Sequence, residues 1–328
     1  MLTNSLRRRE TANRHSEELR RLLGDLVGGY LAEDDTTDII LNPPLPGEAD
    51  GRVWVTRLGH ESEPVGFMSP AQAEALISAV ASTMGNIATA DDPVVEGVLI
   101  IDGSRFEGLI PPIVAAPVFA IRRRASAVFP LSAYVERGQL SARHRDVIED
   151  AVSSRKNILI CGGTGSGKST LMNAVIDAIV RLTPEHRILG IEDTVELQCA
   201  ARNACFMRTS PTVSMRELLR PAMRLFPDRI LIGEVRGPEA LDMLMAWGTG
   251  HPGSAATIHS DTGSPRAALS RLELLLSLAT QAPMQKLIAE TVGMIVCIER
   301  GQKGQRRVTQ IVAVEGFDGH DYRLRTED

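Results

Sequence analysis

The stretch CGGTGSGKST, residues 161–170, decides the fold of this 328-residue chain. It follows NILI at 157–160, of which the last three residues are apolar, and precedes LMNAVIDAIV at 171–180, whose apolar spacing predicts a helix. Gly162, Gly167, Lys168 and Ser169 fit the pattern G-x-x-x-x-G-K-[ST]. A strand before this pattern and a helix after it form the context in which the pattern binds phosphate. The sequence therefore predicts a phosphate-binding loop in an α/β nucleotide-binding domain.

Each residue type in this loop has a chemical reason. Glycines let several backbone N–H groups converge on one concavity, and the positive end of the following helix adds to the attraction for anions. Lys168 is expected to reach the β- and γ-phosphates, and Ser169 is expected to offer its hydroxyl to Mg²⁺. The residues expected to contact the nucleotide are Gly163, Thr164, Gly165, Ser166, Gly167, Lys168, Ser169 and Thr170.

Hydrolysis needs a further group that positions water, and the stretch DRILIGEVRG at 228–237 supplies Glu234. A carboxylate at the end of a central strand lies beside the loop in this fold class, where it can orient or deprotonate the attacking water. Many phosphate-loop enzymes carry an aspartate just before this position, but here Gly233 occupies it, so metal contact is expected through water. The alternative for Glu234 is a surface glutamate that starts a turn.

Acidic residues also follow the apolar strand expected at 187–193. The segment GIEDTVEL at 190–197 contains Glu192, Asp193 and Glu196, and adjacent carboxylates on a strand point in different directions. Either Glu192 or Asp193 is expected to face the nucleotide, near Mg²⁺ or the water. The alternative is an ordinary helix or turn start, where acidic residues are favoured.

Two histidines, His251 and His259, lie in GTGHPGSAATIHSD at 248–261. A histidine at a strand end can donate a hydrogen bond to phosphate, although a lone histidine is more often structural. Their spacing does not resemble a set of metal ligands, and none of the 4 cysteines forms a C-x-x-C pair. No zinc site is therefore expected, and the cysteines are expected to be small buried residues in a reducing compartment.

Bulk composition narrows the function classes. A net charge of −5 and only 4% aromatic residues argue against stable binding of nucleic acid. No apolar run approaches the ~20 residues that cross a bilayer, and MLTNSLRRRE at 1–10 lacks the features of a secretion signal. We expect a cytoplasmic protein that touches a membrane at most from one side.

The pattern changes along the chain and predicts two domains. Residues 1–125 are expected to form a smaller mixed α/β domain, with helices at 14–31 and 69–85, strands at 37–42, 51–59 and 118–124, and a hairpin at 98–110. Ser69 and Gln72 are expected to form a capping box. Residues 126–140 are expected to be a linker, and 141–328 a domain with a mainly parallel sheet, because apolar strands alternate with helices there.

One expected helix, 214–226, carries arginines every fourth residue: Arg216, Arg220 and Arg224. These arginines are expected to form either a subunit-interface stripe or a solvated face. Ser214 and Glu217 are expected to form a capping box, and Pro221 is expected to kink or restart the helix.

Together, these stretches resemble the type II/type IV secretion (traffic) ATPase family, and most of all its conjugal-transfer branch. Four motifs match in order: GGTGSGKST at 162–170, GIEDTVEL at 190–197, PDRILIGEVRGPEA at 227–240 and TGHPGSAATIHSD at 249–261. The resemblance implies a RecA-like phosphate-loop core and a hexameric ring of two-domain subunits with ATP between the domains. It also implies catalytic roles for Glu192, Glu234, Lys168, His259, Arg105 and either Arg122 or Arg123, with the contacting arginine of 122–124 left open.

The leading interpretation is an ATP-hydrolysing motor that works with other type IV secretion components at the inner membrane, on its cytoplasmic side. Mg²⁺ is expected on Ser169, with Glu192 or Glu234 contributing through water. The alternatives are a nucleotide-switched scaffold with little turnover, a pilus or type II secretion motor, and a DNA translocase. The pilus motor is disfavoured because that branch often carries a tetracysteine zinc insert, which this sequence lacks.

Overall fold

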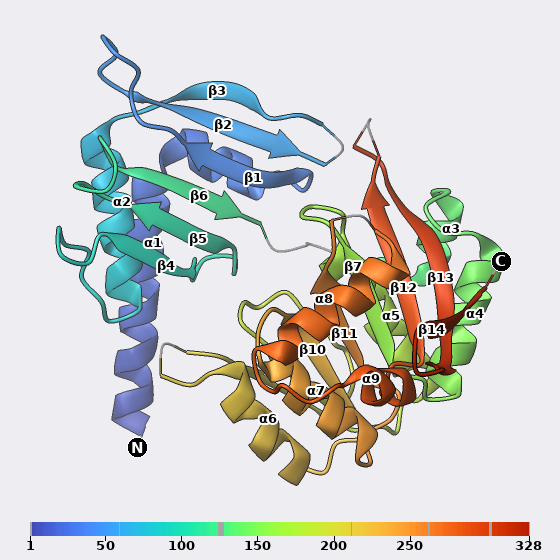
Figure 1. Ribbon diagram of the computed structural model, residues 1–328. Helices are drawn as coiled ribbons and strands as arrows, with labels where there is room; N and C mark the ends of the chain where they lie inside the picture. The colour runs from blue at the N-terminus through green and yellow to red at the C-terminus, as the bar shows by residue number, and fades with distance from the viewer. Residues whose placement is uncertain are drawn as a thin grey trace. The chain divides into compact units, whose positions relative to one another are not determined.

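The computed structural model describes residues 2–58, 60–123, 128–210, 212–261, 263–301 and 304–327, and for residues 2–12 the backbone alone. The chain divides into two compact units, Met1–Ser126 and Ala127–Asp328, which Figure 1 draws in blue to green and in green to red. In the described part of the chain, no helix is long and apolar enough to cross a membrane.

The first unit contains a six-stranded antiparallel sheet in the order β3-β2-β1-β6-β5-β4. Its strands are β1 (Thr36–Leu41), β2 (Gly51–Arg57), β3 (Glu63–Met68), β4 (Val94–Val98), β5 (Arg105–Leu109) and β6 (Val118–Arg122). The alternating apolar residues of β1 and β2 point into the core, as their sequence pattern predicts. Strand β3 was not predicted, since the pattern at 63–68 is broken by a proline and a glycine.

Two helices complete this unit, α1 (Leu2–Ala32) and α2 (Pro70–Thr83), and they share one apolar core with the sheet (Figure 1). Helix α1 is interrupted at Gly24, whose φ is 63°. Ser69 caps α2 by accepting a hydrogen bond from the backbone of Gln72 at 3.3 Å. The Gln72 side chain donates instead to the carbonyl of Leu22 at 3.0 Å, so the expected capping box is only half formed. The Gln72 side chain therefore makes a hydrogen bond to α1 in place of the expected bond to the backbone of Ser69.

The second unit is built on an eight-stranded sheet in the order β14-β13-β12-β7-β11-β10-β8-β9. The run from β12 to β9 is parallel, whereas β12, β13 and β14 pair antiparallel, so the prediction of a mainly parallel sheet is confirmed. The strands are β7 (Ile158–Gly162), β8 (Ile188–Glu192), β9 (Ala204–Arg208), β10 (Arg229–Val235), β11 (Ala255–His259), β12 (Met294–Arg300), β13 (Arg306–Phe317) and β14 (Tyr322–Thr326).

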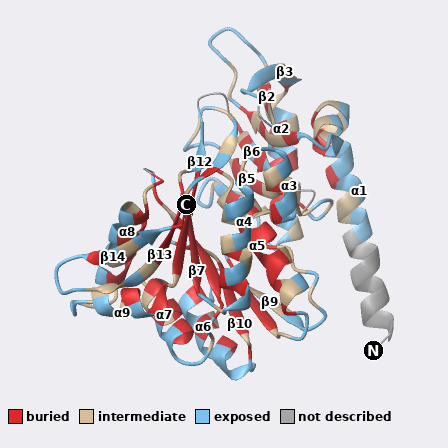
Figure 2. Cartoon of the chain, turned by 90° about the vertical axis from the view of Figure 1, so that its right-hand side faces the viewer, coloured by how far each residue is buried: buried red, intermediate tan, exposed pale blue. Residues whose placement is uncertain are grey.

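Helices cover both faces of this sheet, and Figure 2 shows its strands buried between them. On β7, Ile158 and Ile160 pack into a core with α3, α4 and α5, while Leu159 and Cys161 face a second core with α6 to α9. A strand buried on both faces reads as a continuous apolar run, as NILI does. The helices are α3 (Leu131–Glu136), α4 (Ala142–Ser153), α5 (Lys168–Leu182), α6 (Met215–Arg224), α7 (Glu239–Gly248), α8 (Pro265–Ser277) and α9 (Gln285–Thr291).

The stretch expected to be a linker contributes to this second unit. Helix α3 lies inside it, and Leu131 and Tyr134 are buried in the core with α4 and α5. Pro130 precedes this helix and Gly138 follows it, so the residues that broke the apolar periodicity mark its two ends. Strand β9 and helix α9 were also missed, because both are short and only partly buried.

Helix α6 has the capping box predicted from Ser214 and Glu217. Pro221 lies within the helix, which continues to Arg224, so of the two predicted effects the restart is not found and the kink stays a prediction. The face that carries Met215, Leu219 and Ala222 is buried in the core, and this packing holds the helix together through the proline.

A candidate nucleotide-binding site

The glycine-rich loop connects the buried strand β7 to helix α5, which begins at Lys168. Gly165 and Gly167 have φ values of 70° and 96°, a region that other residues rarely adopt. At the entry to the loop, a Cβ atom on Gly162 would lie 2.2 Å from the carbonyl oxygen of Ile298 on β12. Tight packing at the entry and left-handed turns within the loop therefore explain the glycines.

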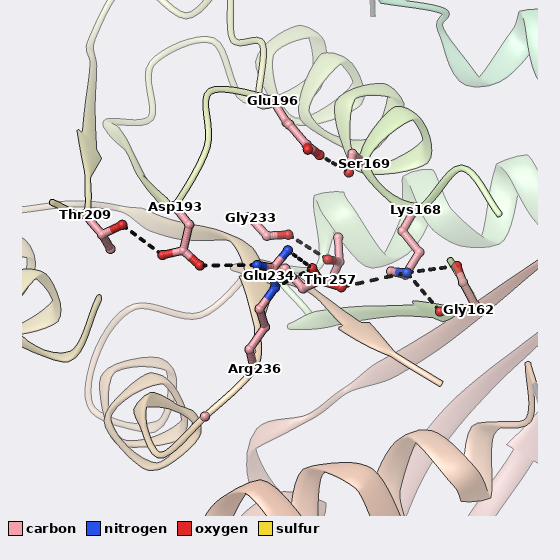
Figure 3. A network of polar contacts seen from close by, with 12 residues as sticks. Gly162, Lys168, Ser169, Asp193, Glu196, Thr209, Gly233, Glu234, Arg236 and Thr257 are labelled. Carbon is pink, nitrogen blue, oxygen red and sulfur yellow. Dashed lines mark hydrogen bonds and ion pairs between the residues drawn. The ribbon is translucent and has the colours of Figure 1, made fainter. Parts of the chain in front are cut away.

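Lys168 lies at the centre of the site with its side chain only 10% exposed (Figure 3). Its Nζ donates to the carbonyl oxygens of Gly162 and Gly163 at 2.9 and 3.0 Å. It also lies 3.8 Å from Oε1 of Glu234. Burial lowers the pKa of Lys168, although Glu234 opposes that effect. A largely buried ammonium with these partners would gain from a nearby phosphate.

Glu234 lies near the end of β10 between two cations. Its Oε1 faces Lys168, and its Oε2 accepts a hydrogen bond from Arg236 Nε at 2.8 Å and lies 2.6 Å from Arg236 Nη2. Arg236 was not predicted as a site residue. A signal was present, because side chains two residues apart on an extended chain point to the same side.

The acids at the end of β8 have different surroundings. Glu192 is 4% exposed, and its Oε2 accepts from the backbone N–H groups of Glu196 and Leu197 at 2.8 and 2.9 Å. Asp193 accepts from the Thr209 hydroxyl at 3.0 Å and lies 3.9 Å from Arg236 Nη1. Glu192 thus holds the backbone of the following turn, and Asp193 extends the polar network around Glu234.

Glu196 is the carboxylate that reaches the loop helix. Its Oε2 accepts a 2.5 Å hydrogen bond from the hydroxyl of Ser169 (Figure 3). Asn173 on the same helix fastens this turn from both sides, donating to the Glu196 carbonyl at 3.0 Å and accepting from the backbone of Gln198 at 2.8 Å. A hydroxyl and a carboxylate side by side are oxygen donors of the kind that Mg²⁺ takes. The sequence placed Glu196 in the right segment but gave it no role.

His259 ends β11, the strand that lies between β7 and β10, and is in register with Gly162. Its Nε2 lies 2.7 Å from Asp261 Oδ1. His251 precedes β11, so it is at the amino end of the strand, where its Nδ1 contacts the Pro227 carbonyl at 2.8 Å. The structure therefore places His259, and not His251, at the end of the sheet that carries the glycine-rich loop.

The carboxy-terminal strands also contribute a residue to the loop. Arg306, at the start of β13, donates from Nε to the Gly165 carbonyl at 3.1 Å. Its cross-strand partner is Arg300 on β12. These strands were predicted only as additions to the sheet, and this contact was not predicted. Arg306 and Gly165 are 141 residues apart, so no local sequence pattern indicates that they meet.

The arginines predicted to contact nucleotide from the first domain are found on its central strands. Arg105 on β5 and Arg122 on β6 are cross-strand partners, and Arg122 Nε lies 2.8 Å from Asp38 Oδ1. Arg123 donates to the Glu33 carbonyl. Arg124 lies outside the described residues. A contact between any of these arginines and nucleotide stays a prediction.

Comparison with known proteins adds an independent line of information. A family model described as "Type II/IV secretion system protein" matches residues 108–317. A probable conjugal transfer protein TrbB of Sinorhizobium fredii is 48% identical over 310 residues, which cover 94% of this chain and 93% of the relative.

Two solved structures share the fold of this chain at lower identity. The ATPase DotB of Legionella pneumophila has a TM-score of 0.59 at 17% identity, covering 94% of this chain and 80% of that chain. The pilus retraction motor PilT with bound ADP has a TM-score of 0.59 at 20% identity, covering 92% and 81%.

Proposed function

The chain belongs to the type II/IV secretion system protein family, and from this membership we propose that it is an ATPase that powers conjugal transfer. The resemblance to a conjugal transfer protein over nearly the whole of both chains supports the biological setting. The solved relatives share the fold alone, so they do not bear on the transported substrate.

One observation carries the proposal of hydrolysis. Glu234 Oε1 lies 3.8 Å from the Nζ of Lys168, the lysine of a loop built to hold phosphates. A loop of this kind could bind nucleotide without cleaving it. An acid beside the lysine provides the group that a water molecule needs in order to attack the terminal phosphate.

We expect ATP to bind with its β- and γ-phosphates against the backbone amides of residues 163–167 and the ammonium of Lys168. Once Lys168 is drawn to the phosphates, Glu234 Oε1 accepts a hydrogen bond from the attacking water. The water oxygen bonds to the γ-phosphorus as the bond to the bridging oxygen breaks and as a proton of the water passes to Glu234 Oε1, which later releases it to solvent, and ADP and phosphate leave. Lys168 stabilises the charge that develops in the transition state.

The residues present fit Mg²⁺, because the hydroxyl of Ser169 and the carboxylate of Glu196 are neighbouring oxygen donors. Ser169 is proposed as a ligand, with Glu196, Glu192 or Glu234 contributing directly or through water. The ion would neutralise charge on the phosphate oxygens. The carboxylate of Glu192 is already engaged by two backbone amides, which favours Glu196 over Glu192 for this task.

Several finer features are part of the same proposal and rest on the family. They are assembly into a homo-hexamer, a cytoplasmic position at the inner membrane, and contact with other type IV secretion components. Nucleotide contacts from Arg105, Arg122 and His259 belong here too, as does the division of the chain into an amino-terminal domain and a phosphate-loop ATPase domain. Light scattering with saturating nucleotide tests the ring, and a monomer would contradict it.

Phosphate release by the wild type, Lys168→Ala and Glu234→Gln tests the central claim, with binding of a fluorescent ATP analogue measured in parallel. Lys168→Ala should lose nucleotide binding while keeping its melting temperature. Glu234→Gln should bind nucleotide but release phosphate at least ~100-fold more slowly. Equal release by the wild type and Glu234→Gln would contradict the motor. It would leave the alternative of a nucleotide-switched scaffold.

A further inference from the structure

Arg236 joins two carboxylates at the carboxyl ends of neighbouring parallel strands, β10 and β8 (Figure 3). Its Nε and Nη2 both contact Oε2 of Glu234, at 2.8 and 2.6 Å, and its Nη1 lies 3.9 Å from Oδ2 of Asp193. The other oxygen of Asp193 accepts a hydrogen bond from the hydroxyl of Thr209 at 3.0 Å. A line of polar contacts therefore runs from Thr209 through Arg236 to Glu234.

The two oxygens of Glu234 differ in what they face. Oε2 is held by Arg236, whereas Oε1 is 3.8 Å from Lys168 Nζ, which is too far for a hydrogen bond. Lys168 makes its hydrogen bonds to the carbonyls of the loop instead. Oε1 is therefore the oxygen on the side of the loop, where the terminal phosphate is expected.

We propose that Arg236 is a positioning residue that holds Glu234 by Oε2 so that Oε1 is presented to the attacking water. The inference rests on the proposed hydrolysis of ATP and adds to it a residue that acts through Glu234. The guanidinium donates a hydrogen bond from Nε to this oxygen and contacts it also through Nη2, and its planar shape fixes the direction of such a contact more closely than the ammonium of a lysine does. Asp193, fixed by Thr209, keeps the guanidinium on this side of Glu234.

The exposure of Arg236 separates this role from a structural one. Its side chain is 54% exposed, and ion pairs of exposed side chains contribute little to stability. Loss of the side chain should therefore leave the melting temperature nearly unchanged. Any fall in turnover would then report on the orientation of Glu234 rather than on the fold.

The chain offers a matched control in Arg216. This side chain is 50% exposed and its Nε lies 2.8 Å from Oδ2 of Asp242, a pair between α6 and α7. We would compare wild type, Arg236→Ala, Arg236→Lys and Arg216→Ala. The measurements are kcat, KM, the Kd of a fluorescent ATP analogue, and melting temperature.

Arg236→Ala should lower kcat by about 10- to 100-fold, since a small misplacement of a reacting group has effects of this size. Its Kd should stay within about twofold of wild type. Arg236→Lys should recover part of the loss and Arg216→Ala should behave as wild type. Asp193→Asn should lower kcat in the wild-type background and add nothing in Arg236→Ala, because it acts through the same guanidinium.

Two results would overturn the inference. One is an Arg236→Ala enzyme with the kcat of Arg216→Ala. The other is an Arg236→Ala enzyme in which kcat falls, Kd rises and the melting temperature falls together, which would show that the role of Arg236 is structural. A wild type that binds ATP without releasing phosphate would instead overturn the proposed function itself, and this role for Arg236 with it.

Discussion

A Cβ atom placed on Gly233 would lie 3.0 Å from the Cβ of Glu192, at the point where β10 and β8 run side by side. This distance leaves little room for a side chain beside Glu192. It gives a physical reason why glycine stands where many phosphate-loop enzymes carry an aspartate. A side chain at this position requires Glu192 to shift by a few tenths of an ångström.

Gly233→Ala should therefore destabilise the second unit, because Glu192 must move to accommodate the methyl group. Overpacking of this kind costs about 1–3 kcal/mol. Urea denaturation would measure the loss. Gly29→Ala on helix α1 is the control, since a Cβ there meets nothing within 4 Å. An unchanged urea midpoint for Gly233→Ala would show that the space beside Glu192 accommodates a methyl group without cost.

Glu192→Ala should lower stability more than Glu234→Gln does. Glu192 is buried and satisfies two backbone N–H groups, those of Glu196 and Leu197. Leaving them unpaired costs about 1.5–3 kcal/mol for bonds to a charged acceptor. Thermal unfolding of the two variants tests the ranking. Glu192→Gln, which keeps an acceptor oxygen, should recover much of the stability, and equal losses in Glu192→Gln and Glu192→Ala would contradict this account.

Glu196→Gln should weaken the part of nucleotide binding that depends on Mg²⁺. The carboxylate accepts from the Ser169 hydroxyl, and its replacement by a neutral amide removes the charge beside that oxygen. Binding of a fluorescent ATP analogue, titrated with Mg²⁺ and then with a chelator, gives the measurement. The control is Glu185→Gln, whose side chain is 71% exposed. If both variants respond equally to Mg²⁺, Glu196 has no part in holding the ion.

His186 should make the protein less stable in mild acid. Burial lowers the pKa of His186 below its ordinary 6.5, and Arg229 lowers it further. The neutral ring accepts from Arg229 Nε at 3.0 Å. An unfolded chain takes up this proton near pH 6.5, so the stabilisation is complete above that pH and is lost as the pH falls toward the lowered value.

The measurement is the urea midpoint from about pH 8 to about pH 5, compared between wild type and His186→Asn. Asparagine keeps an acceptor near Nδ1 but does not titrate, so the variant should lose less stability than wild type on acidification. Parallel curves for the two proteins would exclude His186 as the source of the pH dependence.

Much of the fold follows from local pattern. The strand before Lys168, the helix after it and the capping boundary at Ser214 depend on neighbours within a few residues, so the sequence predicts them correctly. Helix α3 was missed because its stability comes from tertiary packing rather than from a strong local pattern, and strand β9 was missed because it is short and only partly buried. Long-range packing also explains why the Gln72 side chain does not complete the predicted capping box: it donates instead to the carbonyl of Leu22, 50 residues away.

In the candidate site too, the local features were predicted and the long-range contacts were not. The loop and Glu234 are recognisable because their chemistry requires particular residue types at fixed spacing. The links between them are not, since the partner of Ser169 is 27 residues distant and that of Arg306 is 141 residues distant. Register between strands decides such contacts, and a single sequence does not display register.

The order of strands has a consequence for how this protein is made. Strand β7 carries the loop, yet both of its neighbours, β11 and β12, are translated later, beginning at Ala255 and Met294. At roughly 5–20 residues per second, the ribosome exposes β7 for several seconds before either flanking strand emerges. The nascent chain therefore contains the complete loop before it contains either of the strands that pair with β7.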